Sequence, residues 1–445
     1  MSIAFTITQK STTWNLNNRA DTFLLDPVTL ETPTNQSNPV TDTFTVHLRS
    51  VSGSTIRQKI TAYNQLFEQA RQYPGGVNSV YLNLGMKGDA AAWRTRILDG
   101  AIVFDEKLTS GLTTNRMSVE IAITHLPFWE GPETVLALTN ANGTNLTAGI
   151  NVLNANDLTG TSPTKKCNYV DIAAASVAGE LPTPIKLQLK NTYASALGAG
   201  WIGLNNTNPA TCRWLYEAEA SIIGTPIVSS GSSGGYIVSG NISDLAATKL
   251  LEWTFTRNEM TAFAGQMVRF CIRSSINTDY DMLKFKIKLI SGSTTLFESD
   301  WVKSSEGENF AWLELFELRL PPWLVGMDSI GQINLQLFAK AVLPGLWKWG
   351  FDDLMLMPAD SFLHFKTLAA TNALVTLDGI EGVTYLSDSS GDNRVGLQEV
   401  RGGLILQPGK ANRLYFLSHS TTADIANTAH SMQVIAWYRP RRLTI

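Results

Sequence analysis

The sequence predicts a mainly β protein with one strong α-helix and more than one β domain. Apolar and polar residues alternate with a period of two along much of the chain, which is typical of strands with one buried face. One segment near the N-terminus has helical spacing instead. At 445 residues the chain is too long for one small core, so about two to three domains are expected.

The predicted helix follows Ser54 or Thr55, either of which can cap it, and ends at Pro74-Gly75-Gly76. Its apolar residues recur every three or four positions and therefore share one face: Ile56, Ile60, Tyr63, Phe67, Ala70 and Tyr73. Period-two strands flank it on both sides, with apolar residues at Phe44, Val46, Leu48, Val80, Leu82, Leu84, Trp93, Ile97, Met117, Val119, Ile121 and Ile123. We expect the helix to cover a mainly antiparallel sheet.

Composition excludes several classes of function. The net charge of −3 gives no basic footprint for nucleic acid. The N-terminus lacks a signal peptide, and no apolar run is long enough to cross a membrane, so synthesis in a cytoplasm is expected. Cys167, Cys212 and Cys271 are widely spaced and match neither a disulfide framework nor a zinc site. We expect them to be buried free thiols.

The density of apolar residues divides the chain after the N-terminal segment, residues 1–133. Residues 134–212 and 359–445 are both sparse in apolar residues, and we predict that they form two halves of one β-sandwich. Residues 213–358 are denser and are predicted to be an inserted second sandwich. Its clearest strand alternates buried Leu283, Phe285, Ile287 and Leu289 with Lys284, Lys286 and Lys288.

No enzyme motif is found. The five histidines, His47, His125, His364, His419 and His430, are scattered, and none belongs to an HExxH motif. Gly231-Ser232-Ser233-Gly234-Gly235 is predicted to be a flexible loop, because no helix follows it. Asp352 and Asp353 are adjacent in a predicted strand, so we expect them to point to opposite faces and not to form a glycosidase pair. No catalytic residue is assigned, and a non-enzymatic role is predicted.

Tryptophans are concentrated in the predicted insertion. Trp347 and Trp349 lie two apart and should share one strand face, either as a core pair or as a platform for sugar rings. Trp323 follows Pro321-Pro322 in a predicted loop, where it could contact a partner or a glycan. These three are the candidate glycan-binding residues.

Three phrases resemble distal tail proteins of long-tailed, siphovirus-like phages. They are Leu126-Pro127-Phe128-Trp129-Glu130-Gly131 after the strand–helix–strand segment, Leu406-Gln407-Pro408-Gly409-Lys410-Ala411-Asn412, and Gln433-Val434-Ile435-Ala436-Trp437-Tyr438-Arg439-Pro440-Arg441. Ala411 departs from the family's turn. The resemblance implies a ring-forming belt domain, a sheet or barrel with one helix, at residues 1–133. It also implies a galectin-like sandwich at 134–212 and 359–445, with a carbohydrate-binding-module-like jelly roll at 213–358.

The implied function is that of a structural virion protein in a tail-tip ring of about six copies. Implied partners are further copies of the chain, the tail tube, tail-tip hub proteins, and a receptor-binding protein or host-surface glycan. The resemblance places ring contacts in the belt domain, for which the candidates are Phe44, Val46, Trp93, Phe128 and Trp129. The alternatives are a free-standing carbohydrate-binding or adhesion protein and, less favoured, a glycan-degrading enzyme.

The predicted insertion is similar to jelly-roll carbohydrate-binding modules at Tyr216-Glu217-Ala218-Glu219, Gly234-Gly235-Tyr236 and Phe351-Asp352-Asp353-Leu354. In that fold such acids often bind structural calcium. Glu217, Glu219, Asp352 and Asp353 supply the oxygen ligands that calcium prefers. The alternative, which we favour at this stage, is that these acids cap turns and strand ends.

Overall fold

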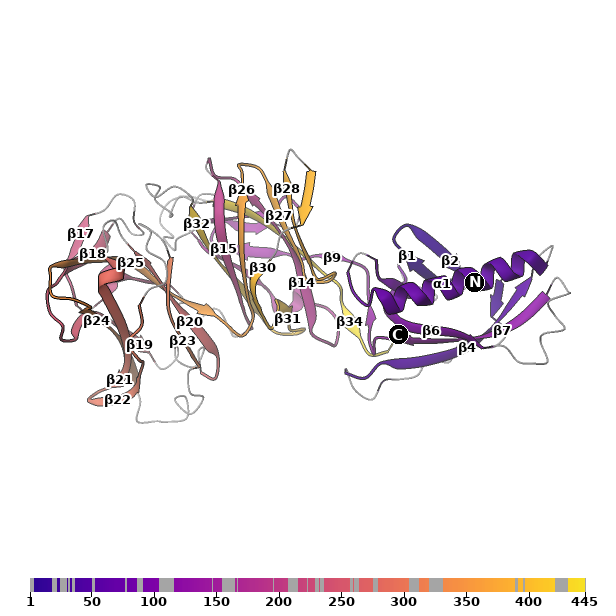
Figure 1. Ribbon diagram of the computed structural model, residues 1–445, viewed down its shortest axis with the longest axis horizontal. Helices are drawn as coiled ribbons and strands as arrows, with labels where there is room; N and C mark the ends of the chain where they lie inside the picture. The colour runs from indigo at the N-terminus through magenta and orange to yellow at the C-terminus, as the bar shows by residue number, and fades with distance from the viewer. Residues whose placement is uncertain are drawn as a thin grey trace.

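A computed structural model confirms the mainly β fold. It describes residues 4–17, 22–24, 30, 33, 37–49, 53–76, 78–85, 91–103, 116–145, 147–153, 165, 167–194, 196–206, 215–221, 223–228, 232, 236–256, 259, 264–274, 279–303, 312–319, 331–388, 391–394, 397–420 and 431–444. Figure 1 shows three β-rich units in a row. We call them the N-terminal unit (β1–β8 with α1 and β34), the central sandwich (β9–β15 and β26–β33) and the insertion (β16–β25).

The N-terminal unit is one sheet with a helix on one face. The sheet order is β2-β1-β5-β6-β7-β4-β3, and the short β8 pairs with β6 and with β34. Its elements are β1 (Ala4–Gln9), β2 (Thr12–Asn15), β3 (Thr22–Leu24), β4 (Val40–Arg49), α1 (Gly53–Gln72), β5 (Val80–Gly85), β6 (Trp93–Val103), β7 (Arg116–His125), β8 (Trp129–Glu130) and β34 (Arg441–Arg442). All strand pairs are antiparallel.

Helix α1 buries the apolar face that its spacing predicts, with one exception. Ile56, Ile60, Tyr63, Phe67 and Ala70 are buried against the sheet. The helix ends at Gln72, however, so Tyr73 lies beyond its last turn and is 45% exposed. The prediction that Tyr73 belongs to the apolar face was therefore wrong.

The central sandwich is assembled from two separate parts of the chain. One sheet has the order β11-β10-β13-β32-β15-β26-β30 and the other β12-β33-β14-β27-β28-β29, with β31 on β14 and β9 on β33. Between the two sheets lies a core with Leu187, Val170, Phe416 and Val434. The strands are β9 (Thr134–Val135), β10 (Leu138–Asn140), β11 (Gly143–Asn145), β12 (Ile150–Leu153), β13 (Tyr169–Ile172), β14 (Thr183–Asn191), β15 (Leu197–Asn205), β26 (Phe362–Ala369), β27 (Leu374–Asp378), β28 (Val383–Asp388), β29 (Gly391–Arg394), β30 (Leu397–Arg401), β31 (Ile405–Leu406), β32 (Asn412–Ser420) and β33 (Ser431–Tyr438).

The insertion has two antiparallel sheets of its own. The larger runs β17-β18-β25-β20-β23 with β16 on β25, and the smaller β19-β24-β21-β22. The strands are β16 (Leu215–Glu217), β17 (Pro226–Val228), β18 (Tyr236–Ile242), β19 (Thr248–Thr256), β20 (Met267–Ser274), β21 (Leu283–Ser291), β22 (Thr294–Glu298), β23 (Trp312–Arg319), β24 (Gln332–Ala341) and β25 (Trp347–Pro358). Strand β21 buries its four apolar residues and leaves its lysines on the outer face.

Two of the three cysteines, Cys167 and Cys271, are buried and free, and burial raises the pKa of both thiols. Cys212 lies outside the described residues. Within the described part of the chain, no helix has the length and apolar character to cross a membrane.

Candidate functional site

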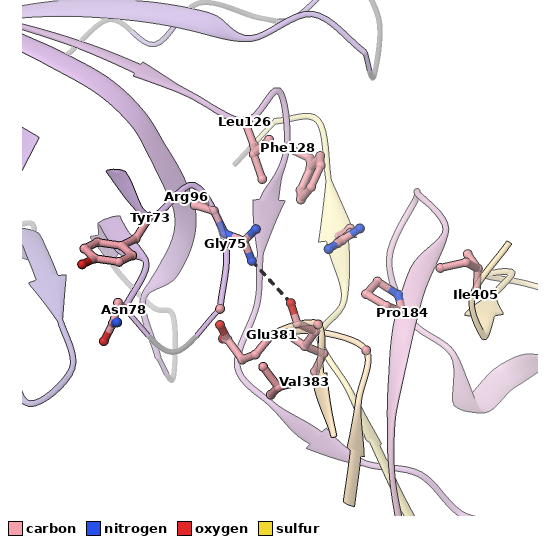
Figure 2. A pocket seen from close by; sticks show the side chains of 15 residues that line it. Tyr73, Gly75, Asn78, Arg96, Leu126, Phe128, Pro184, Glu381, Val383 and Ile405 are labelled. Atoms are coloured by element: carbon pink, nitrogen blue, oxygen red, sulfur yellow. Dashed lines mark hydrogen bonds between the residues drawn. The ribbon is translucent and has the colours of Figure 1, made fainter. Parts of the chain in front are cut away.

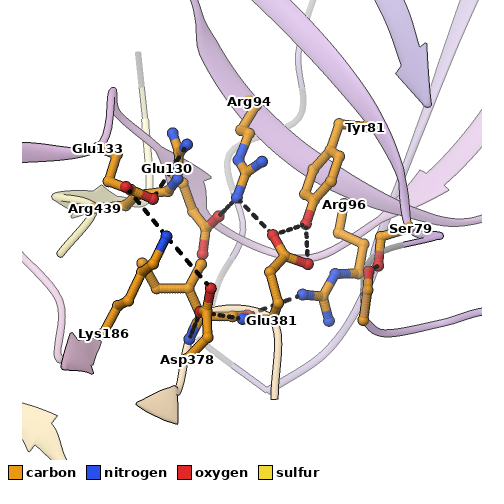
Figure 3. A network of polar contacts seen from close by, with 12 residues as sticks. Ser79, Tyr81, Arg94, Arg96, Glu130, Glu133, Lys186, Asp378, Glu381 and Arg439 are labelled. Atoms are coloured by element: carbon orange, nitrogen blue, oxygen red, sulfur yellow. Dashed lines mark hydrogen bonds and ion pairs between the residues drawn. The ribbon is translucent and has the colours of Figure 1, made fainter. Parts of the chain in front are cut away.

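A polar network joins the N-terminal unit to the central sandwich (Figure 3). Glu381, in the turn between β27 and β28, accepts a hydrogen bond from Tyr81 Oη at 2.9 Å and pairs with Arg94 at 3.3 Å. Arg94 also pairs with Glu130 at 3.3 Å and lies over the Tyr81 ring at 3.9 Å. Burial raises the pKa of Tyr81, so its phenol stays protonated and donates to Glu381.

The chain crosses this junction twice, because β34 returns to the N-terminal sheet. Arg441 pairs with Glu130 at 2.7 Å while the β34 backbone pairs with β8. Arg439 donates to Gly131 O at 3.0 Å, and Lys186 lies 3.5 Å from Glu133. The chain therefore passes between the two units at two places, and the Lys186–Glu133 ion pair lies beside them.

A cavity of about 760 Å³ opens beside this network (Figure 2). It lies between the end of α1, marked by Tyr73, and the β27–β28 turn with Glu381. Arg96 closes one side and donates to Pro74 O at 3.2 Å and Ile380 O at 3.4 Å. Phe128 also lines the cavity, with the Arg441 guanidinium 4.2 Å above its ring. The lining combines apolar side chains such as Leu126, Ile380 and Ile405 with the charged Arg96, Glu381 and Arg441.

The insertion is also joined firmly to the central sandwich. Arg269 on β20 is buried and pairs with Glu399 on β30 at 2.7 Å and with Glu314 on β23 at 2.9 Å. Trp201 of β15 donates to Glu314 at 2.6 Å. The core of the insertion continues without a break into sandwich residues Trp201, Phe362, Tyr415 and Leu417.

An acidic cluster lies inside the insertion. Carboxylate oxygens of Glu217, Asp352 and Asp353 lie within 4.8 Å of one another. The prediction that Asp352 and Asp353 point apart was wrong here. A β-bulge explains it: from Phe351 to Leu354 strand β25 advances three residues while β20 advances two, from Ser274 to Ile272. The extra residue turns both carboxylates to the same side.

Arg273 of β20 is fully buried beside this cluster and pairs with Asp352, with Asp353 at 4.0 Å. Its guanidinium places one positive charge beside the three carboxylates. Burial, together with the nearby carboxylates of Asp352 and Asp353, raises the pKa of Glu219 to about 7. The hard oxygen donors of this cluster are of the kind that a calcium ion prefers.

The two predicted glycan-binding tryptophans that the structure describes, Trp347 and Trp349, both lie on β25 and differ in burial. Trp349 is buried in the core of the insertion, tilted against Phe351 at 5.8 Å. Trp347 is partly buried and donates to Leu343 O at 2.8 Å. Trp323 lies outside the described residues. A glycan contact through these residues stays a prediction.

The predicted ring-contact residues have roles within the chain. Phe44, Val46 and Trp129 are buried in the core of the N-terminal unit. Trp93 and Phe128 keep partly exposed rings, stacked by Arg442 at 4.8 Å and Arg441 at 4.2 Å. A contact of these residues with another copy stays a prediction. No sequence pattern predicts the contacts of Tyr81, Arg94 and Glu381, because no local motif connects residues this far apart.

Comparisons with known proteins give weak matches only. No family model and no curated protein matches the sequence. A chain from the structure of the phage P2 baseplate in its activated conformation with Ca matches with a TM-score of 0.33 and 9% identity, covering 99% of this chain and 98% of that one. A chain from the same baseplate with Sr matches with a TM-score of 0.27 and 9% identity, covering 79% of this chain and 98% of that one. A chain from the infectious bursal disease virus VP2 subviral particle matches with a TM-score of 0.17 and 11% identity, covering 92% of this chain and 83% of that one. All three TM-scores lie below 0.5, so none establishes a shared fold.

Proposed function

We propose that this chain is a structural protein of a phage tail tip, where its N-terminal unit forms a closed ring. The observation that carries this proposal is the open sheet of that unit. Among the described residues, no strand pairs with the outer side of β2 or of β3. Unpaired edges are templates for strands of another chain, and two different edges on one subunit give head-to-tail contacts that can close into a ring.

The remaining units support a projecting role. The junctions at Glu381 and Arg269 brace the central sandwich and the insertion, so both can be held at a fixed angle to the ring. In this proposal a ring of about six copies joins the tail tube to the tail-tip hub proteins. The outer units carry a receptor-binding protein or contact host-surface glycan. The protein acts without catalysis and belongs to the virion.

The acidic cluster of the insertion has a structural role in this proposal. Glu217, Asp352 and Asp353 would hold a calcium ion, which would neutralise their buried charge and fix β16 to β25. Arg273 supplies part of the counter-charge without the ion.

The mass of the purified protein tests the assembly. Wild type is expected to give a discrete oligomer by light scattering, and Thr13→Lys on the exposed edge strand β2 should reduce it to monomer, because an edge lysine blocks further pairing. Thr139→Lys, on an exposed position of the central sandwich, is the matched control and should keep the oligomer. A wild-type monomer that stays monomeric at high concentration and binds polysaccharide would favour a free-standing adhesion protein.

A further inference from the structure

The outer face of the smaller sheet of the insertion carries an unusual concentration of lysines. Five lysines lie on or beside it against two glutamates: Lys249, Lys284, Lys286, Lys288, Lys340, Glu252 and Glu298. Glu252 forms an ion pair with Lys249 at 2.6 Å, and Glu298 pairs with both Lys286 and Lys288. The whole chain has a net charge of −3, so this face differs in sign from the protein.

Two of these lysines have no acidic partner among the described residues. Lys284 on β21 and Lys340 on β24 lie directly opposite each other in the strand register, on the same face. Like charges in directly opposed positions destabilise a sheet. Among the described residues, no carboxylate pairs with either ammonium group and offsets this repulsion.

An aromatic ring lies beside the same two strands. Trp301 has the Lys340 ammonium 4.6 Å and the Lys286 ammonium 5.2 Å from its ring centroid. The indole is partly exposed, and the neighbouring Val302 fixes it to β21 through two backbone hydrogen bonds with Phe285, of 2.8 and 2.9 Å. Phe338, facing Lys286 across the strands, adds a second partly exposed ring, with Lys288 at 5.3 Å.

We propose that this face, defined by Lys284, Lys340 and Trp301, binds an acidic polysaccharide. The flat indole can pack against the apolar side of a sugar ring, while the two opposed ammonium groups bind carboxylate or phosphate groups of the same polymer. The bound anion would remove the repulsion between Lys284 and Lys340. This inference rests on the proposal that the insertion contacts glycan, and it replaces the predicted tryptophans with a different surface.

Binding of the full-length protein to three polymers tests the assignment. The probes are polygalacturonate, which carries carboxylates, a polyglycerol phosphate teichoic acid, which carries phosphates, and neutral dextran. We expect binding to at least one acidic polymer that weakens as salt rises, and none to dextran. Affinity for one acidic polymer and not the other identifies the anionic group.

Variants locate the binding face. The double variant Lys284→Gln with Lys340→Gln should weaken binding about tenfold or more, and so should Trp301→Ala. The matched control, Lys10→Gln with Lys410→Gln, removes two exposed lysines elsewhere and should bind as wild type. The lysine double variant should also unfold at the same or a higher temperature, because it removes a like-charge pair. A merely structural lysine pair would give lower thermal stability instead.

Three results would overturn the inference. They are equal binding of dextran and the acidic polymers, acidic binding that the lysine double variant leaves unchanged, and tighter, lysine-dependent binding of single-stranded DNA than of either acidic polymer. If the lysine face does not bind acidic polysaccharide, the ring proposal still stands, because assembly is measured separately in the same samples by light scattering. A monomer that binds acidic polymer would overturn the ring and keep the face.

Discussion

Tyr81 Oη lies 2.9 Å from Glu381 Oε1, and this hydrogen bond joins residues 300 positions apart in the sequence. It ties strand β5 of the N-terminal unit to a turn of the central sandwich. Arg94 of β6 pairs with the same carboxylate and with Glu130. The Glu381 side chain therefore contacts two neighbouring strands of the N-terminal unit, β5 and β6. These contacts help to fix the N-terminal unit against the central sandwich.

Removing the Glu381 carboxylate should loosen this junction. Glu381→Ala leaves Tyr81 and Arg94 partly unsatisfied in a half-buried place, which should cost about 1–3 kcal/mol of unfolding free energy. In calorimetry, the thermal transitions of the N-terminal unit and the central sandwich should lie further apart in this variant than in wild type. Asp281→Asn, on an exposed position of the insertion, is the control. A single unchanged transition in Glu381→Ala would contradict the junction's role.

The junction of the insertion should depend on pH through Glu399. Its pKa is lowered, chiefly by the hydrogen bond from Arg269. A carboxyl whose folded pKa is depressed adds stability above its unfolded pKa, and this is lost as pH falls through the folded value. Glu399→Gln should therefore cost about 1–2 kcal/mol near neutral pH and progressively less below pH 4.5. Urea unfolding at several pH values measures this, and a cost that persists at low pH would refute the ion pair.

Calcium should stabilise the insertion through its acidic cluster. With the ion at about 100 times its dissociation constant, the expected gain is about 2.7 kcal/mol. Asp353→Asn should abolish most of this gain, because it removes one of three clustered carboxylates. Asp281→Asn again serves as the control. If calcium leaves the unfolding temperature of wild type unchanged, the proposed calcium site is absent.

The close approach of α1 to its sheet should not tolerate a larger residue at Gly100. A Cβ there would lie 2.4 Å from the Phe67 ring, so Gly100→Ala should destabilise the N-terminal unit by about 1–3 kcal/mol. Gly331→Ala is the matched control, since nothing lies within 4 Å of its Cβ position. Chemical denaturation distinguishes them, and equal stability of the two variants would show that the helix can shift without cost.

The sequence predicts local structure here better than it predicts sites. Helical spacing located α1, and period-two alternation located β21 with its buried and exposed faces. The bulge at Asp352 was not predictable, because one extra residue in a strand leaves the alternation on either side intact. Nor was the Lys284–Lys340 pair, because opposition across strands depends on register. The Glu381 contacts depend on how whole units dock, which no short motif encodes.

The C-terminal turn is an intermediate case. The phrase from Leu406 to Asn412 predicted a turn before a strand, and Asn412 is indeed fully buried at the start of β32. Its side chain accepts from the Gln407 amide at 3.1 Å and donates to Lys410 O at 2.7 Å. The asparagine side chain therefore satisfies backbone groups on both sides of the turn.

The central claim is that the N-terminal unit closes a ring, and electron microscopy of the purified full-length protein tests it most directly. The account predicts closed rings of about six copies with the paired sandwiches extending outward, and their loss in Thr13→Lys. Particles that remain single elongated chains, both alone and with purified tail tubes, would contradict it.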